Sequence, residues 1–482
     1  MYPGTGVIKT MQFPASVPTA GASAAAAVSR PAGEATLPLS LRIGWGIGGL
    51  GSYTILSTSS LLLVFFMSTA LGIDPALAGT AIFVSKLYDM ALNPLVGTLS
   101  DRHVSRWGRR RPFLLVGAVL SPAALVLMFN VPPFESDAAT LGWMVATLVL
   151  LATGYTFFNV PYLSMPAEMT DGFHERTVLM SWRVFFVSIA TIVSTAAAPA
   201  LIEAFGGGRA GFAAMSWLVG GVCCFAMIAC FAGTAGARRT GRTTERPGLA
   251  EQARLVLENQ PFRMFIGAKL LQLVGLSASS TALAFLIVTV LGRGNFGLAE
   301  FGIASTVGTI ASMPGWVRLA RQFGKREIYI ASIVVFAATK LSWLLATPHE
   351  SHAVFIARAL LTGITAGGIM LLGTSLLPDC AEYDWRRTGL RREGLYAGFY
   401  SFVEKLAFAL GPLLSGAILS AGGFVKSAGG PPPVQPDSAV VAVFVASTVI
   451  PAVAPLLSIL FLARYRLDEA QLRAMPAPPE RR

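Results

Sequence analysis

Long apolar segments recur along this 482-residue chain, and no other feature restricts its fold as strongly. A helix needs about 20 predominantly apolar residues to cross a membrane. Proline and glycine inside such segments are compatible with helices, because membrane helices tolerate both residues. The sequence therefore predicts an all-α membrane protein with twelve transmembrane helices, at 43–71, 76–100, 112–131, 141–167, 178–204, 210–233, 262–291, 298–317, 327–346, 352–378, 394–421 and 439–464.

Charged residues are too few for a soluble protein. They make up 13% of the chain, whereas a soluble domain carries about 25%. The formal net charge of +12 raises the question of a nucleic-acid partner. The basic residues, however, lie in short loops between apolar segments and form no basic face interleaved with aromatic residues. We therefore expect membrane lipids, and no nucleic acid, as partners.

Lysine and arginine are unevenly distributed between the loops. The loops after the second, sixth, eighth and tenth predicted helices carry basic clusters at 102–111, 238–246, 318–326 and 386–392. Cytoplasmic loops are enriched in Lys and Arg, so the even-numbered helices are predicted to end in the cytoplasm, together with both chain termini. The more acidic loop after the fourth helix does not alter this orientation, because Asp and Glu contribute little to topology.

One long polar interruption divides the predicted helices into six and six. A basic turn follows the second helix of each set, which is what an internal repeat would leave. The first 40 residues are rich in Pro, Ala, Gly and Ser and lack the pattern of a signal peptide. We predict a disordered N-terminal tail (1–40), an N-terminal half (41–234), a cytoplasmic linker (235–261), a C-terminal half (262–465) and a C-terminal tail (466–482).

Three sequence blocks resemble one known family. The first is "YDMALNPLVGTLSDRHVSRWGRRRPFLL", in which Gly97, Asp101 and Arg102 precede "GRRR". The others are "NVPYLSMPAEMTDGFHERTVLMSWRVFF" and "PDCAEYDWRRTGLRREGLYAGFYSFVEKLAFALGP". Together they are similar to the glycoside–pentoside–hexuronide:cation symporters, the melibiose-permease-like branch of the major facilitator superfamily. The resemblance covers roughly residues 42–465. It implies the major facilitator fold, with two six-helix halves and a site near the midplane between them.

Charged residues inside the apolar segments are candidate functional residues, because a charge at the membrane centre costs a few kcal/mol. Lys86 and Asp89 are three residues apart and can share one helix face. The resemblance implies that Asp89 belongs to a cation site and that Arg183 and Lys405 line the sugar or cation pathway. One carboxylate among several cations can exchange a proton or an ion while the local charge stays compensated.

Several acids of the resembling family are replaced in this chain. Asn93 stands where the family has the second carboxylate of its cation site, and Tyr53 and Asn159 stand where it has sugar-site acids. A site with one remaining acid fits proton coupling, or no coupling, better than sodium coupling. We therefore expect H⁺ as the coupling ion and no other cofactor. The cation-coupling candidates are Asp89, Asn93 and Lys405.

The candidate substrate-binding residues follow from the same alignment of motifs. Leu163 stands where an aromatic residue is expected, whereas the hydroxyl and amide groups of Tyr53, Asn159 and Tyr162 can hydrogen-bond the hydroxyls of a sugar. The full set of candidates is Tyr53, Lys86, Asn159, Tyr162, Leu163 and Arg183.

The basic turn after the second predicted helix has two interpretations. Physically, its arginines keep the loop in the cytoplasm near anionic lipid. By resemblance, the turn is also a conformational latch, which contacts charges and helix ends of the other half when the carrier is open to the outside. The latch candidates are Gly97, Asp101, Arg102, Arg109 and Arg110.

Other residues have simpler interpretations. Lys269, Lys340 and Arg358 are expected to form internal pairs between helices or to extend towards a membrane surface. The four cysteines suit packing, and the four histidines lie in loops or at helix ends without metal-ligand spacing, so no metal site is predicted. No catalytic or nucleotide-binding motif is found, which argues against a membrane-embedded enzyme.

We therefore predict a secondary active transporter that moves a sugar, glycoside or similar small solute by alternating access. The alternative is a carrier of amphiphilic or lysolipid-like solutes, or a drug exporter, since relatives of this branch also carry lysolipids. A structural or receptor role would not need buried charges on facing helices. We expect a monomer in a bacterial-type inner (plasma) membrane.

Overall fold

The computed structural model describes residues 37–170, 173–237, 254, 258–389, 392–428, 433–465, 467, 472 and 475. Most of the expected N-terminal tail, of the expected linker and of the expected C-terminal tail lies outside these residues.

Every regular element in the described part of the chain is a helix. The N-terminal helices are α1 (Leu39–Gly46), α2 (Gly48–Thr69), α3 (Pro75–Arg102), α4 (Arg111–Phe129), α5 (Asp137–Ser164), α6 (Pro166–Met169), α7 (Phe173–Ile192), α8 (Ala198–Ala204) and α9 (Gly208–Gly233). The C-terminal helices are α11 (Gln260–Ala284), α12 (Gly294–Phe323), α13 (Lys325–Ser342), α14 (His352–Thr388), α15 (Glu393–Ala421), α16 (Asp437–Phe444) and α17 (Ile450–Arg464). Three π-helical segments, η1 (Val193–Ala197), η2 (Phe285–Val290) and η4 (Val445–Val449), and the 3₁₀ segment η3 (Trp343–Leu345) continue or join these helices.

Eleven helical stretches among the described residues are long and apolar enough to cross a membrane. Each overlaps one of the predicted segments. The remaining predicted segment, 76–100, is the 28-residue helix α3, which is long enough but less apolar. The charged side chains of Lys86 and Asp89 in its middle lower its hydropathy. The prediction of an all-helical, multi-pass membrane protein is confirmed.

The helix ends follow from local sequence signals. Asp74 accepts a hydrogen bond from the backbone N–H of Ala76 at 2.8 Å and so caps α3, with Pro75 in the first turn. Asn259 caps α11 in the same way, through the N–H of Phe262 at 3.0 Å. At the other end, Gly389 adopts a left-handed conformation (φ 71°) and terminates α14.

Two helices extend further than the apolar pattern predicts. The tenth predicted segment ends at 378, whereas α14 continues to Thr388, and the eighth ends at 317, whereas α12 continues to Phe323. Both extensions carry arginines, such as Arg321 and Arg386. A helix can leave the apolar layer without unwinding, because basic side chains favour a helix C-terminus.

Small residues allow neighbouring helices to approach closely. Gly44 and Gly233 face each other between α1 and α9, and Gly117 and Gly154 line the contact between α4 and α5. Gly363 of α14 packs directly on the backbone of Ser305 in α12. Contacts of this kind stabilise membrane helices, since lipid tails are as apolar as the side chains they would replace.

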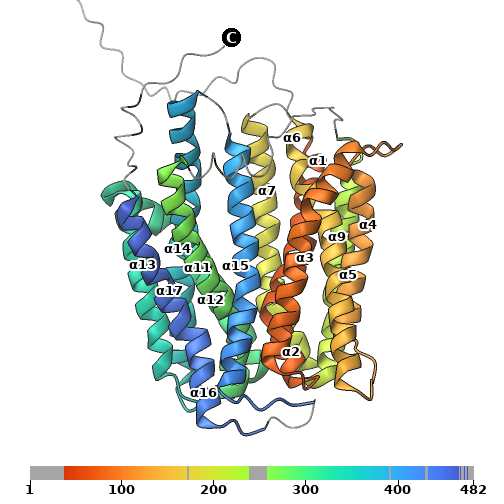
Figure 1. Ribbon diagram of the computed structural model, residues 1–482, viewed down its shortest axis with the longest axis vertical. Helices are drawn as coiled ribbons and strands as arrows, with labels where there is room; N and C mark the ends of the chain where they lie inside the picture. Colours follow the sequence, from red (N-terminus) through yellow and green to blue (C-terminus); the bar gives the residue numbers. More distant parts are fainter. Residues whose placement is uncertain are drawn as a thin grey trace, which may run out of the picture. The chain divides into compact units, whose positions relative to one another are not determined.

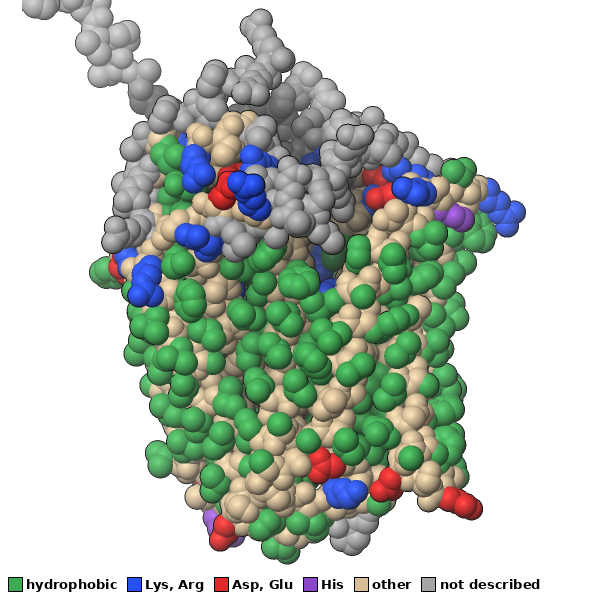
Figure 2. All heavy atoms as spheres, in the orientation of Figure 1, with side chains coloured by type: hydrophobic (Ala, Val, Ile, Leu, Met, Phe, Trp, Pro, Cys, Tyr) green, Lys and Arg blue, Asp and Glu red, His purple; other side chains and the backbone are tan. Residues whose placement is uncertain are grey.

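The surface agrees with a membrane location. In Figure 1 the long helices lie side by side, with the short loops at their ends. Figure 2 shows hydrophobic side chains along the middle of this face. Lys and Arg gather at the end where α3 finishes, and acidic side chains are prominent at the opposite end of this face (Figure 2). The chain is therefore an integral membrane protein.

The N-terminal and C-terminal helices contact each other at the end where α2 finishes and α3 begins. Ser420 of α15 donates a hydrogen bond to Asp74 at 3.1 Å, and Asn295 of α12 donates one to Glu203 of α8 at 2.8 Å. The ring of Phe65 lies 5.1 Å from that of Phe285. We call this set the α3-start contact. It joins α15 to the start of α3, and Lys86 and Asp89 lie further along α3.

Candidate functional site

Asp89 lies at the centre of the candidate site. It is on α3, which packs against α5 and α15, and only 4% of its surface is exposed. One carboxylate oxygen, Oδ2, lies 3.0 Å from Nζ of Lys405 on α15. The other oxygen accepts a hydrogen bond from the hydroxyl of Thr156 on α5. The carboxylate therefore has one partner on an N-terminal helix, α5, and one on a C-terminal helix, α15.

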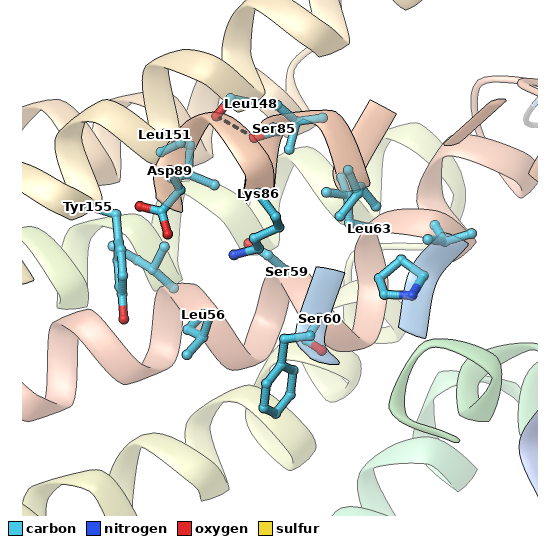
Figure 3. A pocket seen from close by; sticks show the side chains of 16 residues that line it. Leu56, Ser59, Ser60, Leu63, Ser85, Lys86, Asp89, Leu148, Leu151 and Tyr155 are labelled. Carbon is cyan, nitrogen blue, oxygen red and sulfur yellow. Dashed lines mark hydrogen bonds between the residues drawn. The ribbon is translucent and has the colours of Figure 1, made fainter. Parts of the chain in front are cut away.

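A pocket opens beside this ion pair. Lys86 and Asp89 point into it from α3, Tyr155 lies on the α5 side, and Ser59 and Ser60 line it from α2 (Figure 3). The wall from α15 consists of Phe408 and Pro412. Lys86 interacts electrostatically with both Asp89 and Lys405. One carboxylate thus interacts with two ammonium groups beside a pocket lined by α2, α3, α5 and α15.

Asn93 lies one turn after Asp89 but does not touch its carboxylate. Its side-chain amide donates a hydrogen bond to the backbone carbonyl of Asp89 at 2.6 Å. The amide is therefore engaged with its own helix. Of the three cation-coupling candidates, Asp89 and Lys405 are brought into direct contact, and Asn93 lies beside them.

Arg183 approaches from α7. Its stem packs against Gly49 of α2, and its Nε is buried without a hydrogen-bond acceptor among the described residues. It interacts electrostatically with Tyr53, Tyr155, Tyr162 and Glu404. Arg183 thus interacts with tyrosines of α2 and α5 and with an acid of α15.

The remaining substrate-binding candidates occupy different environments. Tyr162 is fully buried, and its ring stacks on that of Trp45 at 4.8 Å. Tyr53 and Asn159 are half-buried on α2 and α5. Leu163 is 42% exposed. None of these four side chains lines the pocket beside Asp89.

Two further charged residues lie near the site. Glu404, the residue before Lys405 on α15, interacts electrostatically with Lys269 of α11, with Arg183 and with Lys405. Only 3% of the surface of Lys269 is exposed. The sequence signal for Glu404 was its position inside an apolar segment beside a second charge. Nothing in the sequence indicated that it faces Arg183, which is more than 200 residues earlier.

Three of the latch candidates, Asp101, Arg109 and Arg110, form an ionic cluster with Glu168 among the N-terminal helices. Arg110 lies 3.0 Å from Asp101 and 3.0 Å from Glu168, which also pairs with Arg109. Arg102 is exposed, and Gly97 faces Val160 of α5 without a tight contact. Glu168 lies on the short helix α6, just after α5, and the sequence prediction did not include it in this set.

Comparison with known proteins identifies the family. A family model described as MFS/sugar transport protein matches residues 44–469. The chain belongs to this family. Membership agrees with the resemblance that the three sequence blocks indicated. It also confirms the interpretation of the chain as a transporter rather than an enzyme.

Relatives of this MFS/sugar transport protein match it along most of its length. It is 27% identical to the uncharacterized symporter YnaJ of Bacillus subtilis, over 92% of this chain and 94% of the relative. It is also 27% identical to the putative glycoside/cation symporter YagG of Escherichia coli, over 90% of this chain and 93% of the relative. The fold is similar to that of the nucleoside transporter NupG, with a TM-score of 0.61, 10% identity and coverage of 88% of this chain and 100% of that chain.

Proposed function

We propose that this membrane transporter is a symporter, which moves a sugar, glycoside or similar small solute together with a proton by alternating access. The observation that carries the proposal is the ion pair between Asp89 and Lys405 beside a pocket. This pair joins an N-terminal helix to a C-terminal helix. The names of relatives, among them a putative glycoside/cation symporter, support both a sugar-like substrate and a coupling cation.

The proposed architecture has twelve crossings in two halves, 41–234 and 262–465. The helix α3 would be the crossing that apolarity alone does not identify. Its ends support this assignment, because the acidic residue Asp74 caps its start and Arg102 ends it in the basic turn. The basic end would face the cytoplasm of a bacterial-type inner membrane, with both termini on that side. The carrier would function as a monomer.

The proposed coupling step is protonation of Asp89. A proton on this carboxylate would remove its attraction to Lys405 and weaken the contact between α3 and α15. Release of the proton would restore the pair. Binding of substrate and binding of the proton would then favour the same rearrangement, which is the differential affinity that a coupled carrier needs.

The surroundings of Asp89 favour a proton over sodium. A proton binds a single oxygen, whereas a hard metal cation is coordinated by several oxygens. One oxygen of Asp89 already lies 3.0 Å from the Lys405 ammonium, which would repel a second cation. Asn93 supplies an amide where a second carboxylate would be needed.

In the proposed site, the polar candidates bind the substrate from the N-terminal helices. Lys86 lines the pocket, and Arg183, Tyr53, Asn159 and Tyr162 offer groups that hydrogen-bond hydroxyls. Leu163 would contribute an apolar contact. The latch would consist of the cluster of Asp101, Arg109 and Arg110 with the neighbouring Gly97 and Arg102, and it would close the basic end in the state that is open on the opposite side.

A second function is favoured by one observation. Most of the pocket wall is apolar and includes Leu56, Leu63, Leu148, Leu151 and Phe408. An amphiphilic substrate such as a lysolipid could place its acyl chain there. Burial of an apolar chain is favourable by about 0.8 kcal/mol per methylene group.

Uptake into proteoliposomes distinguishes the two functions. The probes are a panel of radiolabelled neutral sugars and glycosides and a labelled lysophosphatidylethanolamine, each with and without an imposed pH gradient. We expect saturable sugar uptake that the pH gradient drives. Movement of the lysolipid with no uptake of any sugar would replace the sugar proposal by the amphiphile proposal.

A further inference from the structure

Lys269 is a buried cation without a close partner. It lies on α11 with 3% of its surface exposed. Among the described residues, no acceptor lies within hydrogen-bond distance of its Nζ and no carboxylate within 4.0 Å, and the ring of Tyr329 is 5.7 Å away. A buried ammonium group that lacks hydrogen bonds is costly in an apolar environment. Such a group is well placed to bind a ligand that supplies the missing acceptor.

Glu404 is the nearest source of opposite charge, and it is also unpaired at close range. It lies half-buried on α15. In the described part of the chain, its carboxylate has neither a hydrogen-bond donor nor a cation within 4.0 Å. Its electrostatic partners are Lys269, Arg183 and Lys405. Lys405 is already committed to Asp89 at 3.0 Å.

Arg183 completes the group from the N-terminal helices. Its Nε is buried and has no acceptor among the described residues. Glu404 of α15 therefore interacts through space with Lys269 of α11 and Arg183 of α7, and within the described residues no hydrogen bond or ion pair joins these three side chains to one another. A ligand between them would have to donate to a carboxylate and accept from cations. A hydroxyl group does both, and vicinal hydroxyls offer two such groups side by side.

We propose that Glu404 and Lys269, together with Arg183, form a second ligand subsite of the carrier that binds vicinal hydroxyl groups of the substrate. This inference rests on the proposed function as a sugar carrier. Hydrogen bonds to charged groups are stronger than those between neutral groups, so the subsite would contribute strongly to affinity. It also places substrate contacts on the C-terminal helices, across from Lys86 and Asp89.

A purely structural charge network makes a different prediction. If Glu404 only neutralised Lys269 and Arg183, its loss would impair folding or rate for every substrate equally. If it binds a hydroxyl, its loss would matter only for substrates that carry that hydroxyl. Analogues of one sugar that each lack a single hydroxyl separate these cases.

The test measures KM in proteoliposomes for a transported sugar and its monodeoxy analogues. The variants are Glu404→Gln and Lys269→Met, with Lys340→Met as a matched control. Lys340 is also a buried lysine, but it lies on α13 and donates to Ser279 at 2.8 Å. We expect about a tenfold or larger rise in KM for Glu404→Gln and Lys269→Met, and less than about a twofold rise for the control. For one deoxy analogue, wild type and Glu404→Gln should have the same KM.

The outcomes separate the two proposals. Suppose that wild type carries a sugar of the panel. If Glu404→Gln then keeps the wild-type KM, or raises KM by the same factor for all analogues, the subsite is overturned and the proposal of a sugar carrier stands. If wild type carries no sugar, the carrier proposal fails, and the subsite fails with it. Where Glu404→Gln does not fold, Glu404→Asp keeps the charge and shortens the side chain. A uniform effect of Glu404→Asp across the analogues would equally overturn the subsite.

Discussion

At the scale of single residues, the balance of charge around Asp89 determines what the site can do. Its side chain is buried, and each oxygen has one partner, Lys405 or Thr156. A buried charge is tolerated only while it is paired and hydrogen-bonded, so either partner of the ion pair depends on the other. This dependence is the property that protonation can exploit.

Removing one partner of this ion pair should destabilise the protein. Lys405→Met leaves the Asp89 carboxylate buried and unpaired, and we expect a loss of about 2 kcal/mol or more in the free energy of unfolding. The double variant Asp89→Asn with Lys405→Met should recover part of it, because the buried carboxylate is removed together with its ion-pair partner, while Lys86 keeps its charge. Thermal unfolding of the purified variants checks this. Equal stability of Lys405→Met and wild type would contradict the pairing.

A second acid beside Asp89 should change the ion preference. Asn93→Asp places a carboxylate one helical turn from Asp89, and two carboxylates supply the several oxygens that sodium needs. We expect uptake that responds to a sodium gradient, which wild type should not show. Asn93→Ala is the control, since it removes the amide without adding a charge. Uptake that remains indifferent to sodium in Asn93→Asp would count against a cation site at this position.

At the scale of helices, close packing depends on glycine. A side chain at Gly363 would collide with the backbone of Ser305, whereas nothing lies within 4 Å of the same position at Gly315. The first glycine lies in the contact between α12 and α14, and the second lies on the open side of α12. The two sites therefore separate packing from helix propensity.

Gly363→Ala should destabilise the protein, and Gly315→Ala should not. Overpacking of a tight helix contact costs about 1–3 kcal/mol. At Gly315 the alanine should be neutral or stabilising by up to about 1 kcal/mol, because alanine favours the helix. Thermal unfolding of both variants in the same detergent provides the comparison. The packing argument would be wrong if the two variants had the same melting temperature.

Helix positions could be predicted from the sequence because lipid imposes them. A crossing must be apolar over its whole length, so eleven spans are readable from apolarity alone. The remaining predicted segment, 76–100, which is α3, could be predicted only by allowing for the charges of Lys86 and Asp89 inside it. Helix ends were less predictable, since α14 continues through its basic residues to Thr388.

The site was only partly predictable. A pattern on one helix, such as Lys86 with Asp89, follows from the helical repeat. The contact of Asp89 with Lys405 was suggested by resemblance, because residues 316 positions apart have no spacing that predicts contact. The approach of Glu404 to Lys269 and Arg183 depends on how three helices pack, and no sequence pattern encodes that distance.

At the scale of the whole molecule, the described chain is closed at one end between its N-terminal and C-terminal helices. The α3-start contact includes Asp74 with Ser420 and Glu203 with Asn295. Opening of the carrier at that end has to break these hydrogen bonds. The contact therefore biases the balance between the two open states.

Weakening this contact should open the pocket from that end. In Glu203→Ala, Asn295 loses the acceptor of its backbone and side-chain hydrogen bonds, 3.1 and 2.8 Å long. We expect a several-fold faster reaction of Ser60→Cys in the pocket with an impermeant maleimide applied to the α3-start side. Glu135→Ala, at an exposed acid in the loop between α4 and α5, is the control. An unchanged labelling rate in Glu203→Ala would argue against a closing role.

The central claim is that Asp89 couples transport to the proton, and Asp89→Asn tests it most directly. The asparagine keeps the shape of the side chain but cannot exchange a proton. In proteoliposomes, we expect Asp89→Asn to lose accumulation of substrate driven by a pH gradient, while exchange of labelled for unlabelled substrate persists. Asp137→Asn, at an exposed acid, should behave as wild type. If Asp89→Asn still concentrates substrate in response to the pH gradient, Asp89 is not the coupling site.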